Sequence, residues 1–186
     1  MYGKLRTRTA YLYTSQIQWA DILASPGSSL HCKYEFAFGP DWRNIKGLEA
    51  AVSQIVNVVS NGQKIIFNFP IDIIFKSTNP YQWPQIILSI YNNMKLVGYG
   101  RAYIPLQPKL HTVDVALIKP QSSTLLGYLS SFFGYQPELV QPKMLANCLG
   151  NDMIVMTSNG KVRLTLNVLQ QGLHKLGYDV GKQKQH

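Results

Sequence analysis

The chain has 186 residues, of which 46% are hydrophobic and only 15% are charged. That length suits one domain, and folding at this size buries roughly 70% of the unfolded surface, so the core needs no metal or disulfide. Cys32 and Cys148 are too few for a disulfide framework or a zinc site. The sequence shows neither a signal peptide nor an apolar run of about 18 residues that could span a membrane. We therefore expect an intracellular, reduced protein that is soluble or peripherally attached.

The chain carries 18 basic and 9 acidic residues, which gives a formal net charge of +9. A basic balance favours contact with nucleic acid, anionic membrane or acidic proteins. The bases are scattered, apart from small groups at residues 4–8 and 182–184, and no RNA-binding, zinc-finger or basic-helix signature accompanies them. We expect no nucleic acid partner. Ordinary solvated charge and attraction to anionic membrane or acidic partners both stay open.

Strand patterns begin near the N-terminus. Residues 11–19 alternate between apolar and polar, which should place Ser15, Ile17 and Trp19 on one face. Residues 31–38 alternate in the same way. Both patterns predict strands with one buried face.

Pro70 separates two runs of β-branched and aromatic residues, 64–69 and 71–76. Proline cannot donate to a sheet ladder, so it marks an edge, a strand start or a bulge. Further strands are predicted at 85–91, 96–104 and 113–118, and a hairpin at 153–157 and 161–169 around Asn159-Gly160. Gly98-Tyr99-Gly100, within one of these strands, favours a bulge or a close backbone contact. About eight short strands predict a mainly β protein, an antiparallel β-sandwich forming a single domain over residues 1–186.

Two segments depart from the strand pattern. Residues 48–59 have helical spacing but carry valine and isoleucine, which favour strand, so their structure stays open. Residues 123–133 place Leu125, Leu129, Phe132 and Phe133 on one apolar helical face. We predict one inserted helix there.

The sequence offers no catalytic constellation. Its four histidines have no metal-ligand spacing with another histidine, cysteine or carboxylate, and no phosphate loop or nucleophile elbow is present. The six aspartates are too dispersed to concentrate charge in a calcium loop. We expect no enzyme activity, no metal and no cofactor.

Residues 68–86 form the densest stretch of the chain, with two apolar strands around a loop that holds two prolines, Tyr81 and Trp83. Either these aromatics cap the core, or the loop is a recognition surface, because stiff aromatics bind with little loss of entropy. The same alternatives apply to Phe132 and Phe133 on the predicted helix. These four residues are the candidate partner-binding residues.

Several of these motifs resemble the B9 domain family. They are His31-Cys32-Lys33-Tyr34-Glu35-Phe36 with Gly39-Pro40-Asp41-Trp42, the block 68–86, Gly98-Tyr99-Gly100 with Pro105, and Leu176-Gly177-Tyr178-Asp179. The resemblance runs from about residue 30 to 181 within a domain of about 9–181. The order of the motifs points to one particular member of the family. Ser15 departs from an expected glycine, and the region after Tyr91 is shortened.

The resemblance implies a C2-like β-sandwich without calcium ligands. It also implies a non-enzymatic scaffold subunit of the Meckel syndrome (tectonic-like) complex at the ciliary transition zone, required for ciliogenesis and for the barrier that controls ciliary membrane composition. The implied partners are other B9-domain proteins in a hetero-oligomer, together with tectonic and transmembrane transition-zone proteins. The alternative is a C2-like peripheral module that binds anionic lipids or phosphoinositides without calcium. The implied location is the cytoplasmic side of the cilium base.

Overall fold

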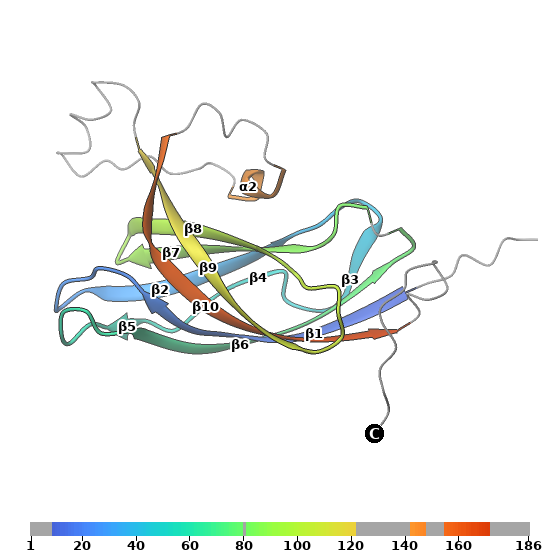
Figure 1. Cartoon of the computed structure of the whole chain (residues 1–186), viewed down its shortest axis with the longest axis horizontal. Coiled ribbons are helices and arrows are strands. Elements are labelled where there is room, and N and C mark those ends of the chain that lie inside the picture. Colours follow the sequence, from blue (N-terminus) through green and yellow to red (C-terminus); the bar gives the residue numbers. More distant parts are fainter. Residues whose placement is uncertain (1–8, 80, 122–141, 148–154, 172–186) are drawn as a thin grey trace, which may run out of the picture.

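The computed structural model describes residues 9–79, 81–121, 142–147 and 155–171 (Figure 1). Nearly all of this part of the chain is antiparallel β structure, which confirms the predicted fold class. The elements are β1 Thr9–Asp21, β2 Ser29–Ala37, β3 Trp42–Gly47, β4 Ala50–Val52, β5 Val56–Asn57, β6 Ile65–Ser77, β7 Gln85–Asn92, β8 Lys95–Tyr103, β9 Leu110–Gln121, the short helix α2 Met144–Asn147 and β10 Val155–Gln171.

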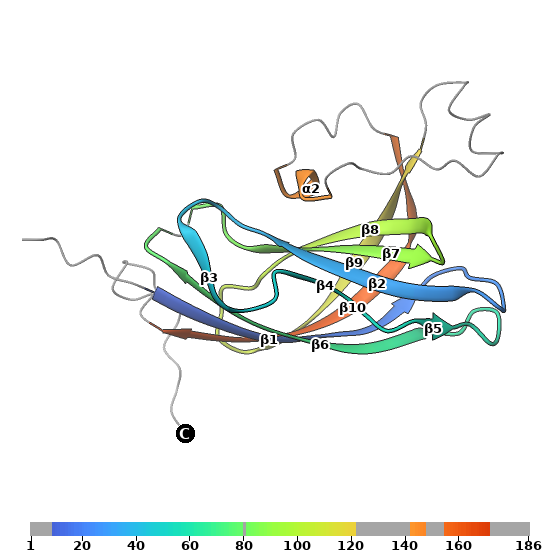
Figure 2. The ribbon, with the colours of Figure 1, turned by 180° about the vertical axis from the view of Figure 1, so that it is seen from behind.

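The strands form one curled sheet whose two halves face each other. Their order is β3-β6-β1-β10-β9-β8-β7-β2-β4, and β5 also pairs with β2. Figures 1 and 2 show the two layers, with β6 and β1 in one and β8, β7 and β2 in the other, while β9 and β10 cross between them side by side. The sandwich is therefore a single sheet that bends where β9 and β10 pass from one layer to the other.

Two glycines permit this bend. β8 and β9 are joined by only two residue pairs, Tyr99 with Ile118 and Gly100 with Leu117. A Cβ atom on Gly100 would lie 2.9 Å from a side-chain carbon of Val115, and one on Gly98 would lie 3.2 Å from the Ile118 carbonyl oxygen. The predicted close backbone contact at this motif is confirmed.

The main core fills the space between the two layers. It is built from inward-facing residues of both halves, such as Tyr13, Phe36, Phe75 and Leu164, all essentially inaccessible to solvent. A smaller cluster lies on the other face of β7 and β8, where Leu145 and Ala146 of α2 cover the side chains Ile87, Leu96 and Tyr99. The short helix thus protects the outside of the second layer.

A bulge in β1 changes the face predicted for Trp19. Tyr13, Ser15 and Ile17 point into the core as expected, but the pairing of β1 shifts between Ile17 and Trp19. The extra residue turns Trp19 to the outer face and places Ala20 in the core instead. The expectation that Trp19 shares the face of Ile17 is wrong for this reason.

β6 runs without a break through Pro70, which pairs with Gln16 of β1. The ladder with β3 ends at the pair Gly47–Ile73, so the proline lies where β6 has a described neighbour on one side only. A missing N–H group costs little at such a position. Asn68, two residues earlier, has a positive φ of 46°, in keeping with the bulge that the proline suggested.

The predicted hairpin around Asn159-Gly160 is wrong. Both flanking segments belong to β10 and pair with β9, and the register shifts between Ser158 and Lys161. Gly160 adopts φ 101°, and a Cβ atom there would lie 2.2 Å from the Asp21 carbonyl oxygen. The Asn-Gly pair therefore forms a bulge within one strand, because residues needed by a tight turn also suit a bulge.

Residues 48–59 adopt the strand alternative in part, as β4 and β5, and contain no helix. Leu48, Val52, Ile55 and Val59 are exposed. The Gln54 side chain donates a hydrogen bond to the Phe67 carbonyl, which ties this segment to β6. The predicted helix at 123–133, with Phe132 and Phe133, lies outside the described residues.

Candidate functional site

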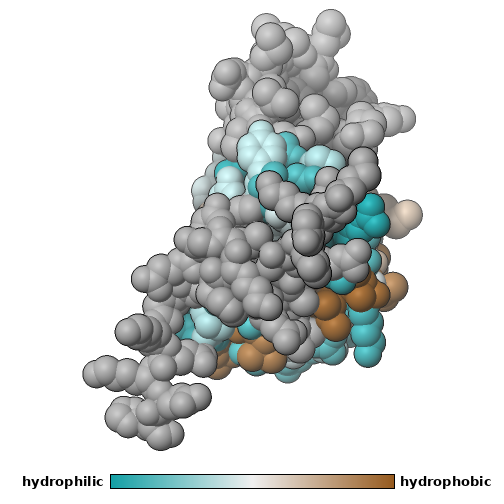
Figure 3. Space-filling view, turned by 90° about the vertical axis from the view of Figure 1, so that its right-hand side faces the viewer, coloured by the Kyte–Doolittle hydropathy of each residue, from teal (hydrophilic) through white to brown (hydrophobic). Residues whose placement is uncertain are grey.

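Three connections meet at one end of the sandwich, and we call this surface the loop end: residues 38–41, 78–84 without 80, and 104–109. They are joined by backbone hydrogen bonds. Gly39 N–H donates to the Gln82 carbonyl over 3.0 Å, and Ile104 N–H donates to the Pro84 carbonyl over 3.3 Å. Figure 3 views this side of the molecule and shows apolar patches next to hydrophilic surface.

Two tryptophans fasten the loop end to the core. The Trp42 indole donates to the Tyr81 carbonyl over 3.0 Å, and the Trp83 indole donates to the Ile104 carbonyl over 2.8 Å. Their rings meet edge to face at 4.9 Å. Trp42 is buried, and Trp83 packs against the main core. For Trp83, the core-capping interpretation is therefore the one that the geometry supports.

Tyr81 has the opposite placement, because its backbone is fixed while its ring is exposed. Its N–H group donates to the Asn79 side-chain oxygen over 3.1 Å, and the Asn79 amide donates to the Asp41 carboxylate over 2.9 Å. The side chain of Tyr81 is 67% exposed. The loop therefore presents an aromatic ring from a backbone that is already ordered.

Tyr81 and Trp83 line a hollow of about 680 Å³, here called the apolar hollow. Tyr103 and Leu106 on its walls are each more than half exposed, at 56% and 52%. The Arg101 guanidinium lies 5.5 Å from the centre of the Tyr103 ring. The complete lining is Asn79, Tyr81, Trp83, Tyr103, Ile104, Pro105 and Leu106. Such a surface suits an apolar side chain of a partner.

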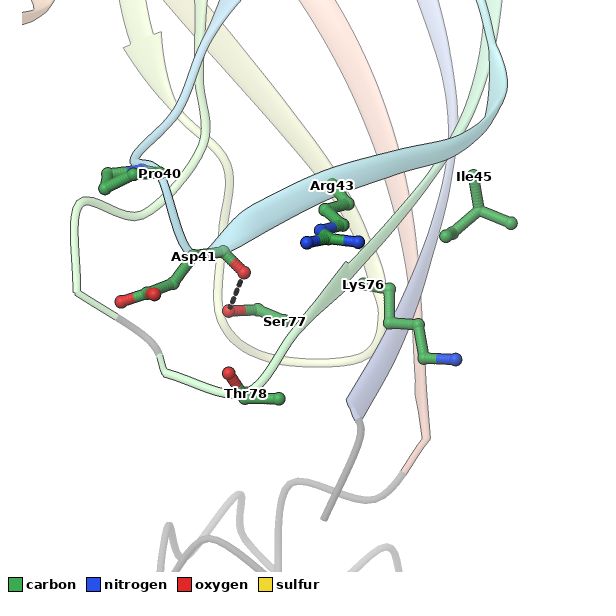
Figure 4. A pocket seen from close by; sticks show the side chains of 7 residues that line it. All are labelled: Pro40, Asp41, Arg43, Ile45, Lys76, Ser77 and Thr78. Carbon is green, nitrogen blue, oxygen red and sulfur yellow. Dashed lines mark hydrogen bonds between the residues drawn. The ribbon is translucent and has the colours of Figure 1, made fainter. Parts of the chain in front are cut away.

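A second hollow, of about 340 Å³, lies on the other side of the 78–79 turn, and we call it the basic hollow (Figure 4). Arg43 of β3 and Lys76 of β6 stand directly opposite each other in the ladder. The Ser77 hydroxyl donates to the Asp41 carbonyl over 3.0 Å and closes one wall. The remaining lining residues are Pro40, Ile45 and Thr78.

Charges on the outer face of β1, β9 and β10 are organised differently. The Trp19 ring lies between two cations, with Lys64 Nζ 4.3 Å and the Arg163 guanidinium 4.6 Å from its centre. Arg163 donates two hydrogen bonds to Asp114, over 2.6 and 2.8 Å. These bonds hold the pKa of Asp114 below its ordinary value and raise the pKa of Arg163. We call the set formed by Trp19, Lys64, Asp114, Lys161 and Arg163 the outer ladder.

The structure describes two of the four candidate partner-binding residues. Tyr81 and Trp83 come together on one hollow, whereas Phe132 and Phe133 lie outside the described residues. The sequence analysis missed Tyr103, Leu106, Arg43 and Lys76. Tyr103 and Leu106 lie on either side of Pro105, just where β8 ends, and this proline is the sequence signal that could have indicated them. Arg43 and Lys76 come together only through strand pairing.

Among the described residues, no three histidine, cysteine, aspartate or glutamate side chains gather in a way that could hold a metal ion. Within the same part of the chain, no helix is long and apolar enough to cross a membrane. Cys32 is fully buried, and burial raises the pKa of its thiol far above the ordinary value.

The fold and the loop end define a class of protein: an antiparallel β-sandwich domain that presents an apolar hollow and a basic hollow beside one fixed loop. A family model described as ciliary basal body-associated B9 protein, B9-C2, matches residues 11–169. The chain belongs to this B9 family.

Individual relatives agree with the family match. B9 domain-containing protein 1 of Mus musculus is 43% identical over 159 residues, covering 82% of this chain and 78% of the relative. The Homo sapiens protein of the same name is 41% identical over 159 residues, with the same coverage of each chain. B9 domain-containing protein 2 of Bos taurus is 26% identical over 157 residues, covering 82% and 89%. The particular member that the motifs indicated is B9 domain-containing protein 1, and that resemblance is confirmed.

These names describe a domain and no catalytic activity. Among solved structures, a C2 domain of plant Extended Synaptotagmin 1 is similar with a TM-score of 0.44 and 10% identity, covering 87% of this chain and 94% of that domain.

Proposed function

We propose that the chain is a non-enzymatic scaffold subunit that binds another B9-domain protein through its loop end. The observation that carries the proposal is the exposed Tyr81 ring beside the apolar hollow, on a loop whose backbone is held by Trp42 and Asn79. Ordering a flexible side chain on binding costs about 0.5–1.5 kcal/mol, and a preordered loop avoids part of that cost. Aromatic anchors of this kind dominate many protein interfaces.

The family supports a partner of the same kind. Relatives of two types, B9 domain-containing proteins 1 and 2, both match most of this chain. In this proposal the complex is a hetero-oligomer of B9 proteins at the ciliary transition zone, on the cytoplasmic side of the cilium base. It corresponds to the Meckel syndrome, tectonic-like complex, with tectonic and transmembrane proteins as further partners. Its role is ciliogenesis and a barrier that controls ciliary membrane composition.

Co-purification tests the proposal. The full chain is co-expressed with the B9 domain-containing protein 2 of the same organism, and the mixture is separated by size exclusion. We expect co-elution that Tyr81→Ala weakens and that Met94→Ala, an exposed residue in the turn between β7 and β8 at the opposite end, leaves unchanged. Wild-type chains that are folded and elute separately would contradict the proposal. A tagged chain that is absent from the cilium base would contradict the location.

The +9 charge supports a second candidate, a peripheral module that binds anionic lipids without calcium. The described bases lie in separate places, two of them in the basic hollow, three in the outer ladder and others such as Lys95 at the start of β8, so a flat membrane cannot contact all of them at once. We expect weak binding to phosphoinositide vesicles that is lost at about 0.5 M salt, where screening is short-ranged. Tight binding at that salt concentration would favour this candidate.

A further inference from the structure

We propose that the basic hollow binds a carboxylate side chain of the protein partner, next to the apolar anchor at Tyr81. This inference rests on the proposed function and specifies the partner's chemistry: an acidic residue must accompany an apolar one. The hollow supplies a guanidinium from Arg43, an ammonium from Lys76 and a hydroxyl from Thr78.

The two cations lack any carboxylate partner in the described part of the chain. Arg43 and Lys76 are paired directly across β3 and β6, and like charges at such positions repel each other. Elsewhere in the described chain, Lys33 pairs with Glu35 and Arg163 with Asp114. An incoming anion would convert the repulsion at the hollow into two attractions.

The carboxylate in the lining of the hollow, that of Asp41, is committed elsewhere. It accepts a hydrogen bond from the Asn79 amide over 2.9 Å. In Figure 4 its oxygens turn away from Arg43 and Lys76, and the Arg43 guanidinium points into the space under β3. The Ser77 bond to the Asp41 carbonyl fixes this wall of the hollow. The hollow is therefore formed before a partner arrives.

The surroundings favour a carboxylate over a phosphoryl group. With Asp41 at the rim, the local charge of the hollow is close to +1, which one monoanion neutralises, whereas a phosphate near −2 would leave net negative charge. Pro40 and Ile45 add apolar walls that suit the methylene groups of an aspartate or glutamate. The planar guanidinium matches both oxygens of a carboxylate.

The position of the hollow links it to the anchor site. Thr78 lines the basic hollow, and Asn79, the next residue, lines the apolar hollow. One partner segment crossing the 78–79 turn can therefore place an acidic side chain on one side and an apolar side chain on the other. The overall charge of +9 adds long-range attraction for an acidic partner.

The test is a titration of the full chain with the B9 domain-containing protein 2 of the same organism, at two salt concentrations. The variants are Arg43→Glu and Lys76→Glu, with Arg43→Gln as a milder change and Lys95→Glu, exposed at the opposite end, as the control. We expect each charge reversal to weaken binding at least about tenfold and to flatten its salt dependence, while Lys95→Glu changes it less than about twofold.

Thermal melts separate binding from folding. Because residue 43 is paired with Lys76 across the two strands, Arg43→Glu replaces a like-charge pair with an opposite-charge pair, so its melting temperature should equal or exceed that of the wild type. Partner binding that persists within about twofold in Arg43→Glu and Lys76→Glu would overturn the inference and leave the proposed function standing. Absence of any wild-type complex would overturn both. Arg43-dependent binding to phosphoinositide vesicles with an unaffected protein complex would overturn the carboxylate assignment.

Discussion

The outer ladder and the loop end both combine tryptophan with cations, yet they use them in opposite ways. In the outer ladder, Lys64 and Arg163 stack on Trp19, and Arg163 is bonded to Asp114. In the basic hollow beside the loop end, Arg43 and Lys76 are paired across β3 and β6 without a described carboxylate partner. The basic residues behind the net charge of +9 therefore have different roles in different parts of the surface. Part of it is used to stabilise the sheet, and part of it is available to a partner.

The aromatic residues at the loop end show a similar division within one loop. Trp83 points inward and donates its N–H group to Ile104, whereas Tyr81, two residues earlier, is mostly exposed. The pair separates a residue that holds the loop from a residue that the loop presents. Substitutions can therefore distinguish the structural role from the binding role.

The largest expected effect is on stability at Trp83. Trp83→Ala removes a ring packed against Trp42 and the core, and it leaves the Ile104 carbonyl without its donor. We expect a loss of about 3 kcal/mol in the free energy of unfolding. Trp19→Ala in the outer ladder should cost only about 1 kcal/mol, because its cation contacts lie on the surface. Denaturant unfolding measures both losses. If Trp19→Ala cost as much unfolding free energy as Trp83→Ala, or more, the contrast between the two regions would be wrong.

The smallest expected effect is the pH dependence of the outer ladder. The Arg163 hydrogen bonds lower the pKa of Asp114 in the folded chain. Its stabilising contribution is therefore complete above the ordinary aspartate pKa of about 3.9 and disappears as the pH falls through the lower folded value. Thermal melts of wild type and Asp114→Asn should differ at pH 7 and converge as the pH falls below about 3.9.

Salt provides the control for this prediction. Because Asp114 and Arg163 lie at the surface, the gap between the two melting temperatures at pH 7 should narrow in high salt. A gap that widens on acidification would show that another group controls the effect.

Much of the fold could be predicted because most strands have one buried face. The alternation in residues 31–38 predicted the buried side chains of β2, and it is confirmed. The bulge in β1 could not be predicted from this pattern, because one inserted residue reverses the face of Trp19 without changing the local composition. The hairpin predicted around Asn159-Gly160 was wrong for a related reason. A positive φ suits both a turn and a bulge, and only the pairing with β9 decides between them.

The candidate site could be predicted only where its residues are neighbours in the chain. Tyr81 and Trp83 lie on one loop between two prolines, so the aromatic loop was visible in the sequence. Their different roles depend on which carbonyl groups lie nearby, as Ile104 does for Trp83. The basic hollow depends on the strand register that brings Arg43 opposite Lys76, and no periodic pattern in the sequence indicates that register.

The central claim, that the loop end and not the outer ladder binds the B9 partner, is tested most directly by one calorimetric comparison. The affinity for the B9 domain-containing protein 2 of the same organism is measured for the wild type, Tyr81→Ala and Trp19→Ala, after melts confirm that each is folded. We predict that Tyr81→Ala weakens binding by about 2 kcal/mol, roughly 30-fold, and that Trp19→Ala leaves it within about twofold. Undiminished binding by Tyr81→Ala together with a loss in Trp19→Ala would contradict the account.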